Sequence, residues 1–588
     1  MNMHRIVKCT TAPLIMFALV FALVPRSAPA APAAPAAQTL DEVTVIVSTG
    51  DVKEFVDRSC AFASNFMPGT TPADLREKLV KSAGIPELKD IPSGMGVAVV
   101  ILPDDKSPMG RSVAFFKAPA ASVDSIMKVL ESQNMKAVKA DGLIVASDKE
   151  GNTSAGVALA RDVNSKVFTG KQTSALHVKA PVGRLINDND TTLRCIMKSM
   201  PEMIKRSEDA SCAKQGRQSM LTTATIRLLQ AEMLAIYGAA KRIGALDLSV
   251  NCPPDGLRID CEITPAAAAA PAEKPATTLD PLKLVKMLPS NGAVRMAAVF
   301  DAKALMEFIK TVMGDALEEM NLTDFDGKQV AAWMDEWAAV TGGGMALNMI
   351  LPEKPFPSGA CIIPVTDPKA VLSMLEESPE RLKTIGFLKL YEALGMPMKL
   401  SFKKNVETVE GVDVHELKVE LDLSRTMPQI TEALKSIGGV IQYKLAIVDN
   451  FLVYAINGQP IADLIKSVKA KGAADANPLA AEKVFGPGAF MYLDYNIGMV
   501  LAAVVDFQSA NMPAEAVKML KKMSAAAANA QPITAAGFEK DGKHMISLHI
   551  PLELIKKCVE AGREMSAEAK QVKAEAKQVK AEDKLTSQ

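Results

Sequence analysis

The stretch EVTVIVSTGDVKEFVD, residues 42–57, determines the fold that we predict, and AVRMAAVFDAKALMEFI, residues 293–309, repeats its pattern. Each stretch starts with an apolar run typical of a buried strand and continues through Asp-x-Lys into helical periodicity. Asp51 and Asp301 stand where a side chain can accept hydrogen bonds from the first turn of a helix. We therefore expect a strand, a helix cap and a helix at both places. The apolar spacing in the second stretch predicts this buried helix face: Leu305, Phe308, Ile309, Val312 and Met313.

Further matches extend this similarity along the chain. GMGVAVVILPDDKSPMG (94–110) matches GGGMALNMILPEKPFPSG (342–359), and a return strand and a helix follow both. Later hairpins also correspond, and several contain the turn signal Asp-Gly. Each half reads as strand-helix, hairpin-helix, hairpin, strand-helix, hairpin. This order predicts an α+β fold of two tandem homologous halves, each an antiparallel sheet of hairpins with helices packed mainly on one face.

Two Ala/Pro-rich segments have the composition of extended linkers, and they divide the 588 residues. The tail repeats the heptad AEAKQVK, which is typical either of a solvated helix or of a helix that pairs with a partner. We predict these regions: a signal peptide (1–30), an Ala/Pro-rich linker (31–40), a first α+β repeat domain (41–264), a second Ala/Pro-rich linker (265–278), a second α+β repeat domain (279–556) and a charged helical tail (557–588).

The first 30 residues have the layout of a secretory signal peptide. Arg5 and Lys8 form a basic start, Ala12 to Val24 is an apolar run, and Ala28-Pro29-Ala30 offers small residues at a cleavage site. The apolar run is shorter than the ~20 residues that cross a bilayer. We expect an exported protein, periplasmic or extracellular, with no transmembrane segment in the mature chain. An uncleaved anchor is the alternative.

The overall composition excludes some classes of partner. The chain carries 67 basic and 67 acidic residues, whereas a nucleic-acid binder normally has a clustered basic excess. It has 19 Phe, 6 Tyr and 2 Trp, too few to suggest a base-stacking surface. We therefore expect no nucleic-acid partner.

One sulfur-rich segment is a candidate metal site. CIMKSMPEM contains Cys195, Met197, Met200 and Met203, and thiolates and thioethers are soft ligands that suit Cu(I). Methionine is also a common core residue, and spacing by three describes one face of a helix, so core packing is the simpler interpretation.

Seven cysteines remain after the signal, an odd number for disulfides. We expect a Cys195–Cys212 bridge. Cys252 and Cys261 flank a tight PPDG turn, and the resulting stagger exceeds the ~7 Å limit on the distance between bridged Cα atoms. We therefore expect both of these to be buried thiols.

The remaining motifs favour structural roles. His415 lies on an apolar strand face and is predicted to be a packed histidine. TGGGMAL, with glycines 342–344, leads into a strand, so a turn explains it better than a phosphate loop. NDND (187–190) and DFDG (324–327) suggest turns and caps, with calcium binding as the alternative. Trp333 and Trp337 share a helix face with apolar residues, which favours packing over a ligand platform.

These observations favour an exported, non-enzymatic binding or scaffolding protein of the cell envelope. Its partner would be an unknown envelope protein or a hydrophobic ligand, held between the duplicated halves, and we expect no cofactor. The alternatives are a soft-metal (Cu(I)) handling protein and a hydrolase with dispersed catalytic residues, because a catalytic triad can be scattered through a sequence.

Overall fold

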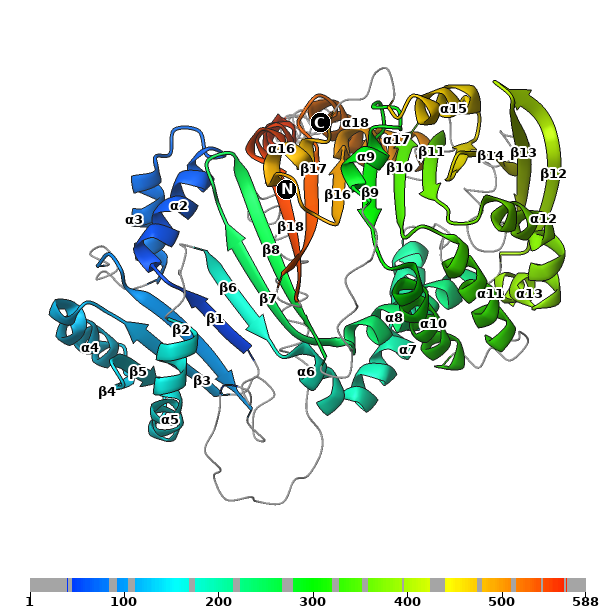
Figure 1. The fold of residues 1–588 in the computed structure, drawn as a ribbon. Coiled ribbons are helices and arrows are strands. Elements are labelled where there is room, and N and C mark those ends of the chain that lie inside the picture. The colour runs from blue at the N-terminus through cyan, green and yellow to red at the C-terminus, as the bar shows by residue number, and fades with distance from the viewer. Residues whose placement is uncertain are drawn as a thin grey trace, which may run out of the picture. The chain divides into compact units, whose positions relative to one another are not determined.

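The computed structural model contains two compact units (Figure 1). Each unit is described by itself. Unit 1 comprises residues up to Asn189 with Ile243–Ala266 and His549–Gln588, and unit 2 comprises Asp190–Arg242 with Ala267–Leu548. The structure describes residues 40, 45–83, 92–103, 111–168, 175–214, 223–266, 279–319, 327–351, 358–393, 396–422, 439–472, 478–508, 514–540, 543–564 and 567. The predicted signal peptide and nearly all of both linkers and of the tail repeat lie outside these residues.

The predicted domain boundaries stay a prediction, and the two compact units do not follow the order of the chain. Residues 190–242 belong to unit 2 although they lie in the first half of the chain, and residues 549–556 belong to unit 1. Among the described helices, none has both the length and the apolar character needed to span a bilayer.

The strands of unit 1 pair in the order β4–β5–β3–β2–β1–β6–β7–β8, and every pair is antiparallel (Figure 1). Their bounds are β1 Val45–Thr49, β2 Gly96–Leu102, β3 Arg111–Lys117, β4 Lys136–Ala140, β5 Leu143–Ser147, β6 Leu176–Ala180, β7 Ile243–Asn251 and β8 Gly256–Pro265. The helices of this unit are α2 Val52–Ser64, α3 Pro72–Ala83, the short 3-10 helix η3 Ala120–Ser122, α4 Val123–Ser132, α5 Glu150–Lys166, α6 Val182–Asp188 and residues 552–564.

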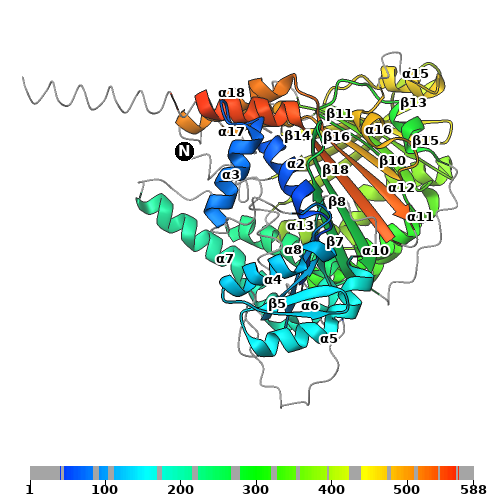
Figure 2. The same cartoon turned by 90° about the vertical axis from the view of Figure 1, so that its left-hand side faces the viewer.

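Helices cover both faces of β5 in unit 1. Ile144 and Val145 are consecutive and therefore point to opposite faces, and both are buried. Val145 packs in one core with Leu159 of α5, and Ile144 packs in another with Leu130 of α4. α4 and α5 accordingly lie on either side of β5 (Figure 2). The prediction of helices mainly on one face is wrong here, because a strand that is apolar on both sides needs cover on both.

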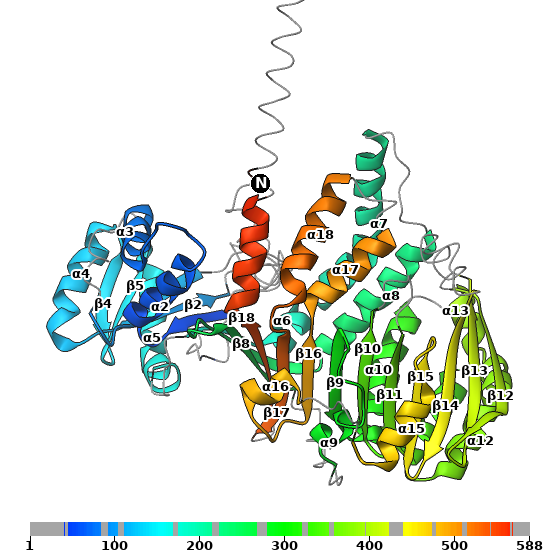
Figure 3. The ribbon, with the colours of Figure 1, turned by 90° about the horizontal axis from the view of Figure 1, so that it is seen from above.

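The strands of unit 2 pair antiparallel in the order β12–β13–β14–β15–β11–β10–β9–β16–β17 (Figure 3). Their bounds are β9 Val294–Val299, β10 Gly344–Ile350, β11 Ser358–Pro364, β12 Met398–Val409, β13 Val412–Leu421, β14 Val440–Val448, β15 Phe451–Ile456, β16 Met491–Tyr495 and β17 Ile533–Lys540. The next strand, β18 (Lys543–Pro551), continues into unit 1 at His549. The α+β class and the antiparallel pairing agree with the prediction.

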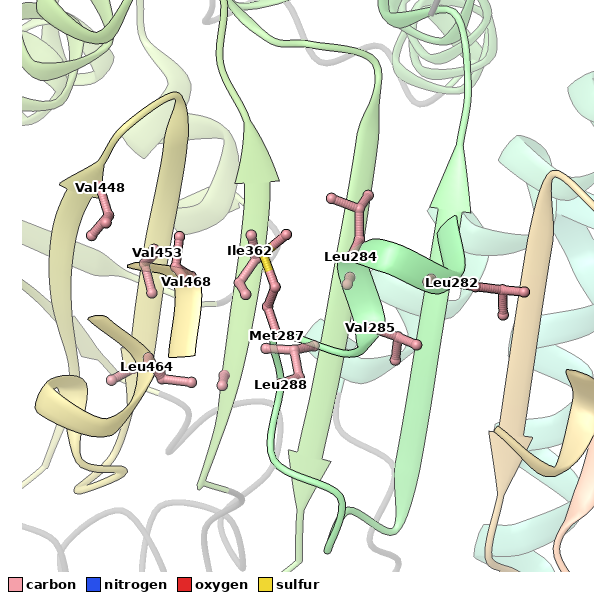
Figure 4. Packing of buried hydrophobic residues seen from close by; sticks show 14 of the residues in the cluster. Leu282, Leu284, Val285, Met287, Leu288, Ile362, Val448, Val453, Leu464 and Val468 are labelled. Atoms are coloured by element: carbon pink, nitrogen blue, oxygen red, sulfur yellow. The ribbon is translucent and has the colours of Figure 1, made fainter. Parts of the chain in front are cut away.

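The main core of unit 2 lies under three short helices. α9, α15 and α16 contribute apolar side chains such as Leu284, Leu464 and Ala481 to this core. Figure 4 shows Leu284 and Leu464 in the same cluster as Ile362 and Val453. The opposite face is packed by longer helices, since Leu445 of β14 clusters with Val371 of α12. The helices of unit 2 are α7 Asp190–Lys214, α8 Thr223–Ala240, α9 Pro281–Val285, α10 Ala302–Glu319, α11 Gly327–Val340, α12 Pro368–Thr384, α13 Phe387–Ala393, α15 Ile461–Lys469, α16 Ala480–Phe485, α17 Ile497–Gln508 and α18 Ala514–Ala528.

The two predicted helix caps are confirmed. A carboxylate oxygen of Asp51 accepts a hydrogen bond from the amide of Glu54 at 2.9 Å, and Asp301 accepts one from Ala304 at 2.9 Å. The predicted buried face of α10 is only partly correct. Phe308 is 40% exposed, with the guanidinium of Arg242 5.9 Å from its ring centre, and the side chains of Val312 and Met313 lie outside the described residues.

Candidate functional site

The four sulfur residues of the predicted metal site all lie on α7. Cys195 is exposed with a free thiol, Met197 and Met200 are half-buried, and Met203 is 63% exposed. Core packing therefore does not account for Met203. Side chains three residues apart are neighbours on a helix, so Met197–Met200 and Met200–Met203 are the simplest pairs to place on one ion. Copper binding stays a prediction.

The predicted Cys195–Cys212 disulfide is wrong. Both residues belong to α7, and 17 positions on one helix correspond to about 25 Å, far beyond the reach of a bridge. The prediction that Cys252 and Cys261 do not form a bridge is confirmed, since Cys261 lies opposite Leu248 and both thiols are free. Both are half-buried rather than fully buried as predicted. Burial raises the pKa of each thiol, which disfavours the reactive thiolate.

Three other predicted structural roles are confirmed. His415 is buried, its ring stacks on Phe402, and its Nδ1 accepts a hydrogen bond from the amide of Asn405 at 3.2 Å. Gly343 has a φ of +68° immediately before β10, so the glycine run is a turn. Trp333 and Trp337 pack against separate apolar clusters of unit 2. The DFDG segment lies almost entirely outside the described residues.

The NDND segment forms a helix junction. Asp190 begins α7, and its carboxylate accepts hydrogen bonds from Tyr237 of α8 and from Arg194, while Lys241 lies 3.2 Å away. Burial raises the pKa of Asp190, but these partners outweigh burial and keep the pKa below its usual value. The carboxylate is thus fully engaged in joining α7 to α8. This arrangement gives Asp190 a structural role, and calcium binding by the segment stays an untested alternative.

A row of polar side chains crosses the middle of unit 2. Arg295 on β9 lies directly opposite Asn348 on β10 and Asp494 on β16, and Asp494 lies opposite Thr534 on β17. Residues opposite each other in antiparallel pairs share a face of the sheet. All four are less than a tenth exposed. We call Asn348, Arg295, Asp494 and Thr534 the buried polar row.

The members of the buried polar row are satisfied unequally. Asp494 accepts hydrogen bonds from the amides of Ala480 and Ala481 at 2.7 and 2.8 Å, which fixes the start of α16. Burial raises the pKa of Asp494, while those amides and Arg295 act in the opposite direction. Neither polar atom of the Asn348 side chain has a hydrogen-bond partner in the structure. Such a row makes strand order and register specific, because a slip would leave charges unmatched.

The surface of unit 2 has a hollow between α11 and α12. It has a volume of about 430 Å³ and is open to solvent. Beneath it, Ile385 packs with Trp333 and Leu382, so its floor belongs to the folded core. Arg381 on the rim pairs with Glu336 across the two helices. We call this the α11–α12 hollow, and its lining is Gln329, Ala332, Glu377, Glu380, Arg381, Thr384 and Ile385.

Compared with protein-family models, curated proteins and solved structures, the chain matches none of them. Within the part of the chain that the structure describes, His, Cys, Asp and Glu side chains form no group of three or more that could hold a metal ion.

The α11–α12 hollow and the buried polar row were not predicted from the sequence. Ala332 and Arg381 are far apart in the chain, and only the packing of α11 on α12 brings them together. For the polar row a signal was available: Arg295, Asn348 and Asp494 each interrupt an otherwise apolar strand. Polar residues in such strands need partners, so the three could have been grouped.

Proposed function

We propose that this chain is an exported, non-enzymatic binding protein of the cell envelope, and that its partner is another protein. The layout of the first 30 residues supports export. The α11–α12 hollow is the observation that carries the binding proposal.

The chemistry of the hollow favours a protein partner over a hydrophobic ligand. Small apolar ligands occupy enclosed sites with mostly apolar walls. This hollow is open, and five of its seven lining residues are polar or charged. Of its two apolar residues, Ala332 is exposed, whereas Ile385 lies at the buried floor, so a partner would mainly contact the polar and charged side chains of the lining. Such a polar, solvent-accessible surface is typical of the rim of a protein interface.

Site-specific photo-crosslinking in the native envelope tests the proposal. A benzophenone amino acid at Ala332, inside the hollow, is expected to yield a defined crosslinked protein. The same probe at Ala339, exposed on the same helix outside the hollow, serves as the matched control. Adding Arg381→Glu should reduce the crosslink at position 332. Equal crosslinking at both positions, or no effect of Arg381→Glu, would refute a specific interface at the hollow.

We also propose that the two halves arose by duplication. The support is topological: the strands of the first half pair in the order β4–β5–β3–β2–β1–β6–β7. In the second half the order is β14–β15–β11–β10–β9–β16–β17, with the β12–β13 hairpin as an addition. Position by position these orders correspond. Independent refolding of residues 279–548 would support this proposal, and a fragment that never folds would count against separable halves.

The exposure of α7 supports a second candidate function, Cu(I) handling. Cys195 and Met203 are exposed, and the half-buried Met200 lies between them in the sequence. Competition with a chromogenic Cu(I) chelator measures the affinity. The double variant Met200→Leu/Met203→Leu is expected to lose at least tenfold in affinity, whereas Met306→Leu on α10 should not. Equal affinities would exclude copper binding at α7.

A further inference from the structure

The last strand that the structure describes, β18, carries a histidine in an unusual environment within unit 1. His549 is 4% exposed, and neither ring nitrogen has a hydrogen-bond partner in the structure. The nearest carboxylate oxygen belongs to Asp255 in the PPDG turn, 3.5 Å from Nε2. Directly after β18 begins the helix of residues 552–564, and the amide of Leu552 donates to the carbonyl of Asp255 at 2.8 Å. Asp255 of the turn thus lies close to His549, near the end of β18, and to Leu552, at the start of the helix.

The packing around the ring leaves little room. A Cβ on Gly256 would lie 2.7 Å from Nε2 of His549 and 2.3 Å from the carbonyl oxygen of Ile550. Only glycine allows the turn to approach this closely. A protonated ring, which needs two hydrogen-bond acceptors, would therefore find Asp255 but no space for a solvation shell. The carboxylate of Asp255 is itself 71% exposed, so solvent weakens its attraction to the ring.

The electrostatic balance favours a neutral ring. Burial lowers the pKa of His549 below its usual value of 6.5, and Arg258 on β8 acts in the same direction. Asp255 acts in the opposite direction but does not compensate. A histidine whose pKa is lower in the folded state binds its proton more readily when the contact opens. The contact is therefore fully stable above pH 6.5 and loses stability as the pH falls below that value.

We propose that His549 is a pH-sensitive latch, which holds residues 552–564 against the PPDG turn at neutral pH and releases them when its ring takes up a proton. The helix that it anchors is held by few deeply buried side chains, Leu554 and Ala561 among them. Residues 567–588, with the heptad repeat, follow directly. The latch would thus control how firmly the helix of residues 552–564, which precedes the repeat, is held in unit 1.

Hydrogen exchange of the full-length protein, followed by mass spectrometry between pH 7.5 and 5.0, tests this latch. After correction for intrinsic rates, the opening constant of residues 552–564 is expected to rise about tenfold per pH unit below 6.5 until the ring titrates in the folded state. His549→Gln should abolish this rise. His544→Gln, on the same strand and in contact with Phe490, should leave it unchanged. A rise that persists in His549→Gln, or no rise in the natural protein, would overturn the proposal.

A second variant keeps the test decisive if His549→Gln does not fold. Asp255→Asn retains the turn but removes the carboxylate that favours the protonated ring. The rise in the opening constant should then continue to lower pH than in the natural protein. If the opening constant depends on pH in the same way in Asp255→Asn and in the natural protein, Asp255 does not influence the protonation of His549 and the proposal is wrong.

Discussion

The central strands of the two units bury different kinds of side chain: apolar ones in unit 1, and polar and charged ones in unit 2. In unit 1, Ile46 of β1 pairs with Val100 of β2, and both are buried in an apolar core. In unit 2, Arg295 of β9 pairs with Asn348 and with Asp494, and all three are buried as well. Both β1 and β9 have an antiparallel neighbour on each side. The central position in the sheet therefore does not explain why the buried residues of β9 include polar ones.

The two kinds of row contribute differently: the apolar row to the stability of the fold, and the charged row to the choice of one strand register. Burial of an apolar row stabilises the folded state by about 25 cal/mol for each Å² of apolar surface removed from water. Burying a charged row costs the free energy of solvation of its charges. Only well-placed partners offset that cost, so the row contributes little to the net stability of the fold. What the charged row provides is a penalty for wrong register, because a slipped strand would bury unmatched charges. We infer that unit 2, with its larger number of strands, depends more on such a penalty.

The largest effect is expected for Arg295→Met, which removes the buried guanidinium that lies opposite Asp494 on the neighbouring strand and favours its ionised carboxylate. Removing one partner of a buried pair costs about 3–5 kcal/mol. Urea unfolding, read by hydrogen exchange on peptides of β9 and β10, measures this loss in unit 2 alone. Arg381→Met, which breaks a solvent-exposed pair, should cost about 0–1 kcal/mol. Equal losses in the two variants would contradict a special role for the buried row.

Val100→Asn places a polar side chain in the apolar row of unit 1. Val100 is fully buried, so an unpaired amide there should cost about 3 kcal/mol. Val99→Asn, one position along on the opposite and more exposed face, is the matched control and should cost less than about 1 kcal/mol. If both variants lose the same amount, strand propensity rather than burial explains the loss.

Tyr237→Phe tests the junction between α7 and α8. The hydroxyl donates to Asp190, so its removal should destabilise unit 2 by about 1–2 kcal/mol. Tyr391→Phe on α13, measured by the same urea unfolding, provides the comparison for loss of a tyrosine hydroxyl elsewhere in the unit. No loss in Tyr237→Phe would mean that Arg194 and Lys241 hold Asp190 unaided.

Asn348→Val should have the smallest effect, and in the opposite direction. It gives unit 2 the residue type that unit 1 has at Val100, and it removes two buried polar atoms that lack partners. The expected gain is about 1 kcal/mol in the free energy of unfolding. A loss instead would show that the Asn348 amide has a partner in solution, such as a buried water molecule.

The sequence predicted local features well where one short segment determines them. The Asp51 and Asp301 caps and the stagger between Cys252 and Cys261 depend on neighbouring residues only, and all were confirmed. Predictions that depend on long-range packing were less successful. The Cys195–Cys212 bridge was wrong because the sequence did not reveal that α7 continues through Pro201 as one helix. The α11–α12 hollow could not be predicted, since it exists only where two distant helices meet.

Native mass spectrometry of the protein, purified without harsh detergent from the cells that make it, tests the proposed function most directly. The account predicts a free protein of unmodified mass together with a complex that contains a second protein. Arg381→Glu should deplete that complex, because Arg381 lies on the rim of the α11–α12 hollow. A stoichiometric lipid-sized adduct, with no protein complex, would contradict the account and identify a carrier of hydrophobic ligands instead.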